Sequence, residues 1–186
     1  MRQYYLINNI DLRQPRSIPL AEKYIVRTAK MHPWFLKPLG QIITTLSNLT
    51  LDSDGEIDSL KERVDRNGEP YYSIELKNYP LENGAKINYE ILKKLNSKGH
   101  VYEIRIMLKD CHGDNNCRIF MTVNVGAPYF VWTYGFTKQK NQYLYANMSA
   151  NKLTDVLAIA THRVFSGINS GDEDNYIGKA GERHEI

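Results

Sequence analysis

The sequence of 186 residues predicts an α+β domain: an N-terminal strand, a helical hairpin, an antiparallel three-stranded meander and a C-terminal helix. Two patterns predict this class. Apolar residues recur at helical spacing near both ends, and apolar and polar residues alternate in the third quarter. The composition of 42% hydrophobic and 24% charged residues is ordinary for a globular protein. It excludes a wholly disordered chain, a collagen-like repeat and a coiled-coil rod, and the length suits one domain.

The N-terminal part is expected to form a strand followed by two helices. Residues 4–7 are of β type. Ser17 can cap a first helix that has Pro19 in its first turn, where the missing N–H costs nothing, and Pro33 stops this helix. Apolar residues at helical spacing then predict a second helix over residues 35–49. The two helices are therefore expected to form a hairpin.

The next segment carries mixed signals. Residues 52–70 are highly charged and predict one short surface helix, followed by a turn at Asn67-Gly68. Residues 71–76 favour a strand. Residues 87–95 fit either a short helix or an extended approach to the strand that follows.

The third quarter has the clearest pattern. Residues 101–109 alternate, with Glu103 and Arg105 on the face opposite a mainly aliphatic set. Residues 118–125 alternate in the same way, and a turn then leads into a third strand over residues 129–137. We expect these strands to form an antiparallel meander of two hairpins.

The C-terminal part is expected to form one helix and a mobile tail. Ser149 caps an apolar stripe at helical spacing, and Gly167 has the character of a residue just past a helix end. Residues 171–186 are polar and acidic without a periodic pattern, which predicts mobility. The expected organisation is a single domain over residues 1–170 and a flexible acidic tail.

The distribution of charge is more informative than the net charge of +3. The tail holds five acidic and two basic residues, so residues 1–170 carry +6. Residues 71–140 hold ten basic and six acidic residues. A mildly basic body with an acidic tail is compatible with a polyanionic partner.

Several classes of protein find no support in the sequence. Dinucleotide-binding, P-loop and H-E-x-x-H motifs do not occur, so no cofactor is predicted. No apolar segment suits a bilayer span and no leader precedes Tyr4, so we expect a cytoplasmic protein without a membrane partner. Cys111, His112 and Cys117 lack the paired spacing of structural zinc sites, and two cysteines fit a reducing compartment. No metal is predicted.

The basic residues of the third quarter form the most informative set. Arg105 and Arg118 lie on the less apolar faces of adjacent predicted strands, so they are expected to project together from the sheet. Lys138 and Lys140 follow at the end of the third strand, with tyrosines beyond. Guanidinium groups grip phosphate oxygens bidentately and aromatic rings stack on bases, so this set suits a phosphodiester backbone. The alternative is a set of solvated strand ends that form salt bridges with Glu103 and Asp110.

Three segments of this region resemble the RelE/HigB toxin superfamily, and its phage-derived HigB branch in particular. They are Gly99-His100-Val101-Tyr102-Glu103-Ile104-Arg105, Cys117-Arg118-Ile119-Phe120 and Tyr134-Gly135-Phe136-Thr137-Lys138-Gln139-Lys140. The family's order of strand, two helices, three strands and a helix agrees with the elements predicted above. This chain is longer than typical members. The extra length lies mainly around residues 52–90, interpreted as an insertion, and in the tail.

The resemblance implies a function. Members are ribosome-dependent mRNA endoribonucleases, the toxins of toxin–antitoxin pairs, so mRNA on the ribosome and a cognate antitoxin are the expected partners. It implies four catalytic candidates, Arg105, Arg118, Lys138 and Lys140. Four tyrosines become RNA-binding candidates, Tyr102, Tyr134, Tyr143 and Tyr145.

The expected reaction is attack of the ribose 2′-hydroxyl on the adjacent phosphorus. Lys138 or Lys140 would act as the base if neighbouring cations lower its pKa, and Arg105 and Arg118 would stabilise the developing charge. Gln139 replaces a lysine of the family motif. The alternative is a non-catalytic binding module on the same fold, such as a gyrase-directed toxin or a phage protein, and a third hypothesis is a structural protein that oligomerises through the helical hairpin.

Overall fold

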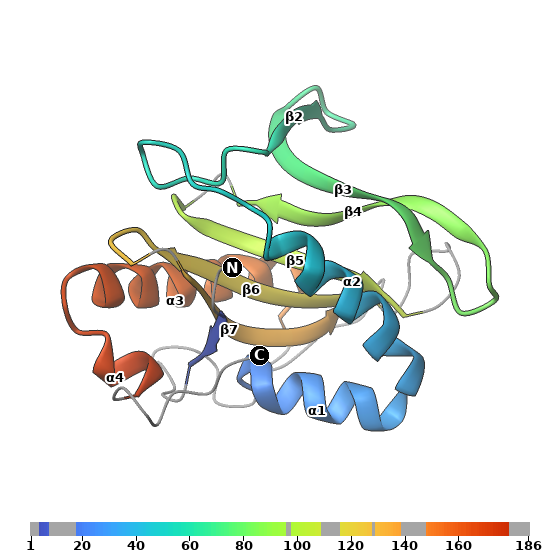
Figure 1. Cartoon of the computed structure of the whole chain (residues 1–186), viewed down its shortest axis with the longest axis horizontal. Helices are drawn as coiled ribbons and strands as arrows, with labels where there is room; N and C mark the ends of the chain where they lie inside the picture. The colour runs from blue at the N-terminus through green and yellow to red at the C-terminus, as the bar shows by residue number, and fades with distance from the viewer. Residues whose placement is uncertain are drawn as a thin grey trace.

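The computed structural model describes residues 4–7, 18–95, 98–108, 116–127, 129–138 and 148–178. Within these residues, strands form a seven-stranded sheet in the order β1-β7-β6-β5-β4-β3-β2, with helices packed against it (Figure 1). The α+β class predicted from the sequence is confirmed. The strands are β1 (Tyr4–Leu6), β2 (Lys61–Val64), β3 (Pro70–Pro80), β4 (Lys86–Lys94), β5 (Val101–Met107), β6 (Asn116–Asn124) and β7 (Tyr129–Lys138). The helices are α1 (Ala21–Met31), the 3₁₀ turn η1 (Pro33–Phe35), α2 (Leu36–Leu46), α3 (Ala150–Asn169) and α4 (Asp174–Ile177).

The sheet is larger than the predicted meander. β5, β6 and β7 are antiparallel neighbours, as the alternating patterns indicated. They do not form a separate three-stranded unit, because β1 joins β7 in parallel and β4, β3 and β2 continue the sheet beyond β5. The segment around residues 52–90, interpreted as an insertion, therefore supplies strands of the same sheet (Figure 1).

The short surface helix expected within residues 52–70 is wrong. Asp52 accepts hydrogen bonds from the backbone N–H groups of Asp54 and Glu56, each at 2.9 Å, and holds that stretch as a turn. The hairpin between β2 and β3 has the same cause, since Asp65 accepts from the N–H groups of two later residues and Gly68 has a φ of +84°. Aspartate side chains that bind nearby backbone compete with helix formation. The ambiguous residues 87–95 are extended and form most of β4.

Helices cover both faces of the sheet. On one face, α1 and α2 pack against the apolar side chains of β5, β6 and β7, including Ile104, Ile119 and Trp132. On the other face, α3 packs against Phe120 and Val131. We call these the α1–α2 face and the α3 face. Each face has its own apolar core, so the sheet forms the middle layer of three.

The first helix starts later than the sequence predicted and ends where proline was expected to stop it. Its N-cap residue is Leu20, so Pro19 precedes α1, and Ser17 lies outside the described residues. His32 precedes Pro33 and has a φ of −138° and a ψ of 80°, which ends α1, because a residue before proline disfavours the helical conformation. Pro38 lies in the first turn of α2, where the lost N–H has no helical partner. The helical hairpin expected from the sequence is therefore present, with a short 3₁₀ turn between its helices.

The start of α3 agrees with the sequence and its end does not. Ser149 Oγ accepts a hydrogen bond from the backbone N–H of Lys152 at 3.3 Å, as expected of a cap. Gly167, however, lies within the helix, which continues to Asn169. A Cβ at position 167 would lie 2.1 Å from the ring of Tyr176, so this glycine makes room for α4 rather than ending α3.

The first part of the expected tail is packed. Residues 174–177 form α4, and Ile177 is fully buried against the core of the α3 face. The hydroxyl of Tyr129 donates a hydrogen bond to the Glu173 carboxylate. The packed elements therefore extend past the domain boundary expected at residue 170, and residues 179–186 lie outside the described residues.

Candidate functional site

The two predicted arginines lie side by side on the α3 face. Arg105 of β5 and Arg118 of β6 are direct cross-strand partners in the antiparallel register. Along the same strands, Val101 and Phe120 point into the core beneath α3. The α3 face therefore changes from apolar to charged along β5 and β6, and the arginines lie at its charged end. The expectation that these two side chains project together agrees with this register.

A buried carboxylate joins the two arginines. Glu103 is 4% exposed; its Oε2 accepts a hydrogen bond from Arg105 Nε at 3.2 Å, and its Oε1 lies 3.4 Å from Arg118 Nε. Arg105 also donates to Glu90 of β4. Burial alone would raise the pKa of the Glu103 carboxyl, but the charges of Arg118 and Arg105 hold it below its ordinary value. Glu103 is therefore ionised at neutral pH.

Arg118 is the least satisfied member of this group. It is 7% exposed, and neither its Nε nor its Nη1 has a hydrogen-bond partner among the residues that the structure describes. A buried guanidinium with unmet donors is unusual, because each unmet donor carries a desolvation cost. Donors of this kind suit an anion such as a phosphate, which accepts in a bidentate manner.

Two lysines complete the site. Lys138 at the end of β7 is half-buried, and burial together with the charge of Arg118 lowers the pKa of its ammonium group. Lys93 of β4 is likewise half-buried, and burial together with the charge of Arg105 lowers its pKa. Each lysine therefore loses its proton more readily than a solvated lysine. We call Glu90, Lys93, Glu103, Arg105, Arg118 and Lys138 the charged cluster; its four cations and two anions leave a net charge of +2.

The sequence did not reveal that β4 contributes to this cluster. Lys93 is the register partner of both Ser73 and Glu103, which places it on the α3 face. The register shifts between β3 and β4 next to Glu90, which brings that carboxylate to the same face. Residues 87–95 gave no clear period, because Ile91 is an extra residue at the register shift and interrupts the alternation of β4.

The predicted tyrosines are distributed differently from the arginines. Tyr102 lies on the α1–α2 face, fully buried, and donates a hydrogen bond to Glu56. Tyr134 is fully buried in the core of the α3 face. The structure therefore does not bring these two rings to an accessible part of the charged cluster. Four further residues named from the sequence lie outside the described residues, namely Asp110, Lys140, Tyr143 and Tyr145.

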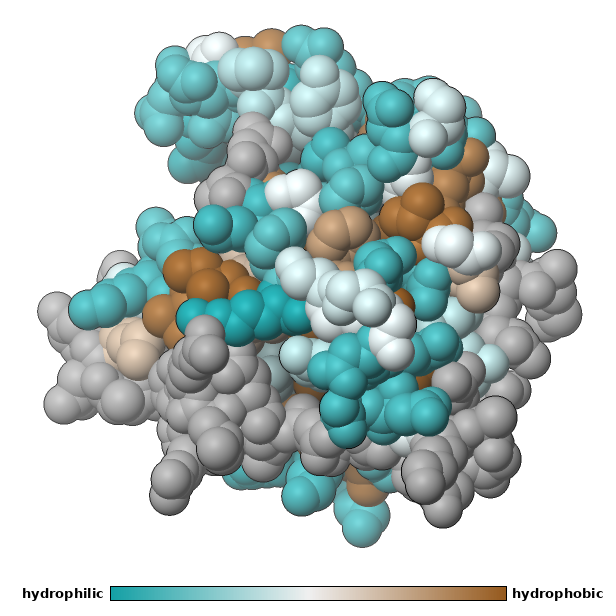
Figure 2. Space-filling view, turned by 90° about the vertical axis from the view of Figure 1, so that its left-hand side faces the viewer, coloured by the Kyte–Doolittle hydropathy of each residue, from teal (hydrophilic) through white to brown (hydrophobic). Residues whose placement is uncertain are grey.

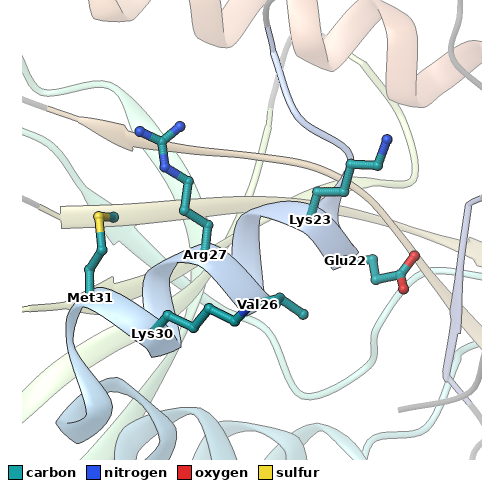
Figure 3. A pocket seen from close by; sticks show the side chains of 6 residues that line it. All are labelled: Glu22, Lys23, Val26, Arg27, Lys30 and Met31. Atoms are coloured by element: carbon teal, nitrogen blue, oxygen red, sulfur yellow. The ribbon is translucent and has the colours of Figure 1, made fainter.

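A separate groove runs along α1. It has a volume of about 520 Å³ and is lined by the exposed side chains of Glu22, Lys23, Val26, Arg27, Lys30 and Met31, which fan out from the helix (Figure 3). These cations are exposed, in contrast to the buried Arg118. Exposed charges are screened by solvent and hold no fixed geometry. The charged cluster is therefore the stronger candidate for chemistry.

Cys117 does not contribute to a reactive site. Its thiol is free and fully buried, and burial raises its pKa to about 12. The described residues contain no group of three or more His, Cys, Asp or Glu side chains arranged to hold a metal ion. Cys111 and His112 lie outside that part of the chain.

Comparison with known proteins does not identify a family for this chain. The chain matches no family model, no curated protein and no solved structure. In the part of the chain that the structure describes, no helix is long and apolar enough to cross a membrane.

Proposed function

We propose that this protein is a RelE/HigB-like endoribonuclease, the toxin of a toxin–antitoxin pair, that cleaves mRNA on the ribosome. The observation that carries the proposal is the buried, incompletely hydrogen-bonded guanidinium of Arg118 beside a lysine of lowered pKa, Lys138. Arg105 is the cross-strand neighbour of Arg118. The three residues combine binding of a phosphate, stabilisation of added negative charge and a proton acceptor on one sheet face.

These groups suit metal-independent cleavage of RNA. In its neutral form, Lys138 accepts the proton of the ribose 2′-hydroxyl, and the resulting oxygen forms a bond to the adjacent phosphorus. The guanidinium groups of Arg118 and Arg105 stabilise the charge that accumulates on the phosphate oxygens. The bond from phosphorus to the 5′-oxygen breaks, which leaves a 2′,3′-cyclic phosphate. The leaving 5′-oxygen takes a proton from a cationic group of the site.

The decisive experiment is cleavage of a defined mRNA by the purified protein with and without ribosomes. We expect 5′-hydroxyl and cyclic-phosphate ends, mapped by primer extension and end labelling. Arg118→Ala is expected to lower the rate by about 100-fold, the usual effect of removing one transition-state donor. Because Arg118 is buried, Lys138→Met serves as a second variant, with an expected loss of about 100-fold or more.

The control is Lys77→Gln, which removes a cation from an exposed position on β3. It is expected to cleave like the parent. The proposal is wrong if the parent protein with ribosomes leaves the mRNA intact, or if folded Lys138→Met and Arg118→Ala both cleave at the parent rate. Circular dichroism and thermal melting establish that each variant is folded.

A second function is favoured by a different feature of the same cluster. Arg105 is already engaged by both Glu90 and Glu103, an arrangement that also suits a rigid binding surface without catalysis. A non-catalytic toxin would inhibit growth without cutting RNA, through a target such as gyrase. Growth inhibition that persists in both Arg118→Ala and Lys138→Met would favour this function over the nuclease. Under either function we expect a cognate antitoxin, encoded by a neighbouring reading frame.

A further inference from the structure

The charged cluster continues beyond β4 onto the two outermost strands. Cross-strand partners share one face of a sheet. Glu103 of β5 is paired with Lys93 of β4, and Lys93 is paired with Ser73 of β3. On the next strand, Arg63 of β2 reaches the carboxylate of Glu75 at 3.3 Å. A row of polar groups therefore crosses the α3 face from β6 to β2.

Unmet hydrogen-bond donors recur along this row. Ser73 is fully buried, and its Oγ has no hydrogen-bond partner among the described residues. In the same described part of the chain, Arg63 Nε is buried without a partner, although its Nη2 binds Glu75. These groups repeat the property of Arg118 at a second place on the same face. Buried polar groups are normally satisfied, so two separate places with unmet donors call for an explanation, and a bound ligand would supply one at Arg63.

An aromatic ring lies within this row. The ammonium group of Lys93 lies 4.3 Å from the centre of the Tyr71 ring, a cation–π contact. Arg63 is the register partner of Tyr71, so the ring lies between the two outer cations. Cations that follow a backbone, combined with a ring on which a base stacks, are the usual features of single-strand binding surfaces.

The dimensions suit a few nucleotides. Arg118 lies on β6 and Arg63 on β2, four strand spacings apart, which corresponds to about 19 Å across the sheet. The end of the molecule that carries β2 stands out from the rest and is mostly hydrophilic (Figure 2). An RNA strand that runs from the charged cluster toward β2 would pass across β4 and β3, because these strands lie between β5 and β2 in the sheet.

We propose that β2, β3 and β4 form a second RNA-binding site, which holds nucleotides that flank the cleaved bond. Lys93 and Arg63 bind backbone phosphates, and Tyr71 stacks on a base. This inference rests on the proposed function, because it takes the charged cluster as the place of cleavage. It gives the segment around residues 52–90 a role in extending the substrate site.

The test measures binding separately from cleavage. Fluorescence anisotropy is recorded with 2′-O-methyl RNA, which lacks the attacking hydroxyl, as a 12-mer and as a trinucleotide. For Arg63→Gln we expect about tenfold weaker binding of the 12-mer and unchanged binding of the trinucleotide. Lys93→Gln also removes a member of the charged cluster, so it is expected to weaken the binding of both lengths of RNA. The slope of log affinity against log salt concentration is expected to fall by about 0.7 for each lost phosphate contact. Lys77→Gln on β3 is the matched control and keeps the parent affinity.

The outcomes separate this inference from the proposed function. Parent-like binding of the 12-mer by both variants overturns the inference, and so does an equal loss for both lengths of RNA in Arg63→Gln. Failure of the parent to bind the 12-mer also overturns it. If the parent binds but does not cleave unmodified RNA, while both variants bind the 12-mer more weakly, the binding site is supported and the nuclease proposal fails. Melting temperatures close to the parent's establish that the variants are folded.

Discussion

Arg118 and Lys138 illustrate how burial turns ordinary side chains into candidates for chemistry. In water, a lysine remains protonated far above neutral pH and accepts no proton from a hydroxyl group. Burial and the nearby Arg118 charge both disfavour the ammonium form of Lys138, so its pKa is lowered. Within the described part of the chain, two N–H donors of the Arg118 guanidinium have no hydrogen-bond partner, so they are suited to a phosphate. Under the proposed function, the base and the anion-binding group would therefore depend on each other, because the charge of Arg118 lowers the pKa of Lys138.

A first prediction concerns the pH dependence of cleavage. If Lys138 acts as a neutral base, the rate rises with pH through the lowered pKa of this residue and then levels off. Arg105→Gln removes a cation that lowers this pKa, so the midpoint of the profile is expected to move to higher pH, in addition to a fall in the maximal rate. Single-turnover rates between pH 6 and pH 10 measure both effects. A midpoint that is unchanged in Arg105→Gln would contradict the role of Lys138.

Glu103 leads to a prediction about stability. Its pKa is held below 4.5 in the folded protein, so its contribution to stability is complete above the unfolded-state pKa and is lost as the pH falls through the folded-state value. Glu103→Gln leaves two arginines without their shared carboxylate. The free energy of unfolding is expected to fall by about 3 kcal/mol at pH 7, and by progressively less at more acidic pH.

Urea denaturation at pH 7 and at pH 4 tests this expectation. Glu62→Gln on β2 is the control, since Glu62 is exposed and surface substitutions change stability by no more than about 0.5 kcal/mol. An equal loss for Glu103→Gln at both pH values would indicate a defect in packing rather than the loss of an ionised carboxylate.

At the scale of elements, α1 determines where the end of β7 lies. Gly135 lets the ring of Tyr24 pack directly on the strand; a Cβ there would lie 2.3 Å from Tyr24 Cδ1. The Tyr24 hydroxyl also forms a hydrogen bond of 2.9 Å with Thr137 Oγ1, next to Lys138. Helix α1, on one face of the sheet, therefore fixes the end of β7, which carries Lys138 on the opposite face.

Gly135→Ala is accordingly expected to destabilise the protein by about 1–3 kcal/mol through overpacking against Tyr24. If the clash is the cause, Gly135→Ala should cost less in a Tyr24→Ala background, because alanine lacks the Cγ and Cδ1 atoms that the new methyl group meets. A double-mutant cycle based on chemical denaturation measures the coupling. Additive losses would show that Gly135 is required for another reason, such as its backbone conformation.

Strand alternation predicted part of the charged cluster from the sequence and missed the rest. Alternation placed Arg105 and Arg118 on one face correctly, because side chains of period two have a single arrangement once two strands form a hairpin. Glu90 was missed, because its face depends on the shift of register between Ile74 and Glu75, and Lys93 was missed, because residues 87–95 gave no clear alternation. The burial of Tyr102 depends on Glu56, which lies far away in the sequence, and this pairing has no local signal.

In the sheet as a whole, the interface between β4 and β5, which we call the seam, has few paired residues. Within the described residues, β4 pairs with β5 along Leu92–Lys94, whereas β5 pairs with β6 along its full length. Glu56 braces this seam: its carboxylate binds Lys94 of β4 at 2.9 Å and also accepts from Tyr102 of β5. The hydrogen bond and the charges that favour ionisation outweigh burial, so the pKa of Glu56 lies below its ordinary value.

This arrangement predicts that the outer strands open before the rest of the molecule. A seam with few backbone pairs costs less free energy to separate than a complete one, so amides of β2 and β3 are expected to exchange through a smaller opening than those of β5 and β6. Glu56→Gln removes the ionised acceptor of two contacts. It should lower the opening free energy of the outer strands by about 2 kcal/mol and leave β5 and β6 nearly unchanged. Native-state hydrogen exchange, resolved by peptide mass spectrometry, measures both quantities.

If Glu56→Gln lowers protection equally in all strands, the sheet opens as one cooperative unit. In that case the segment from β2 to β4 is an integral part of the domain rather than an insertion that gained a place at its edge.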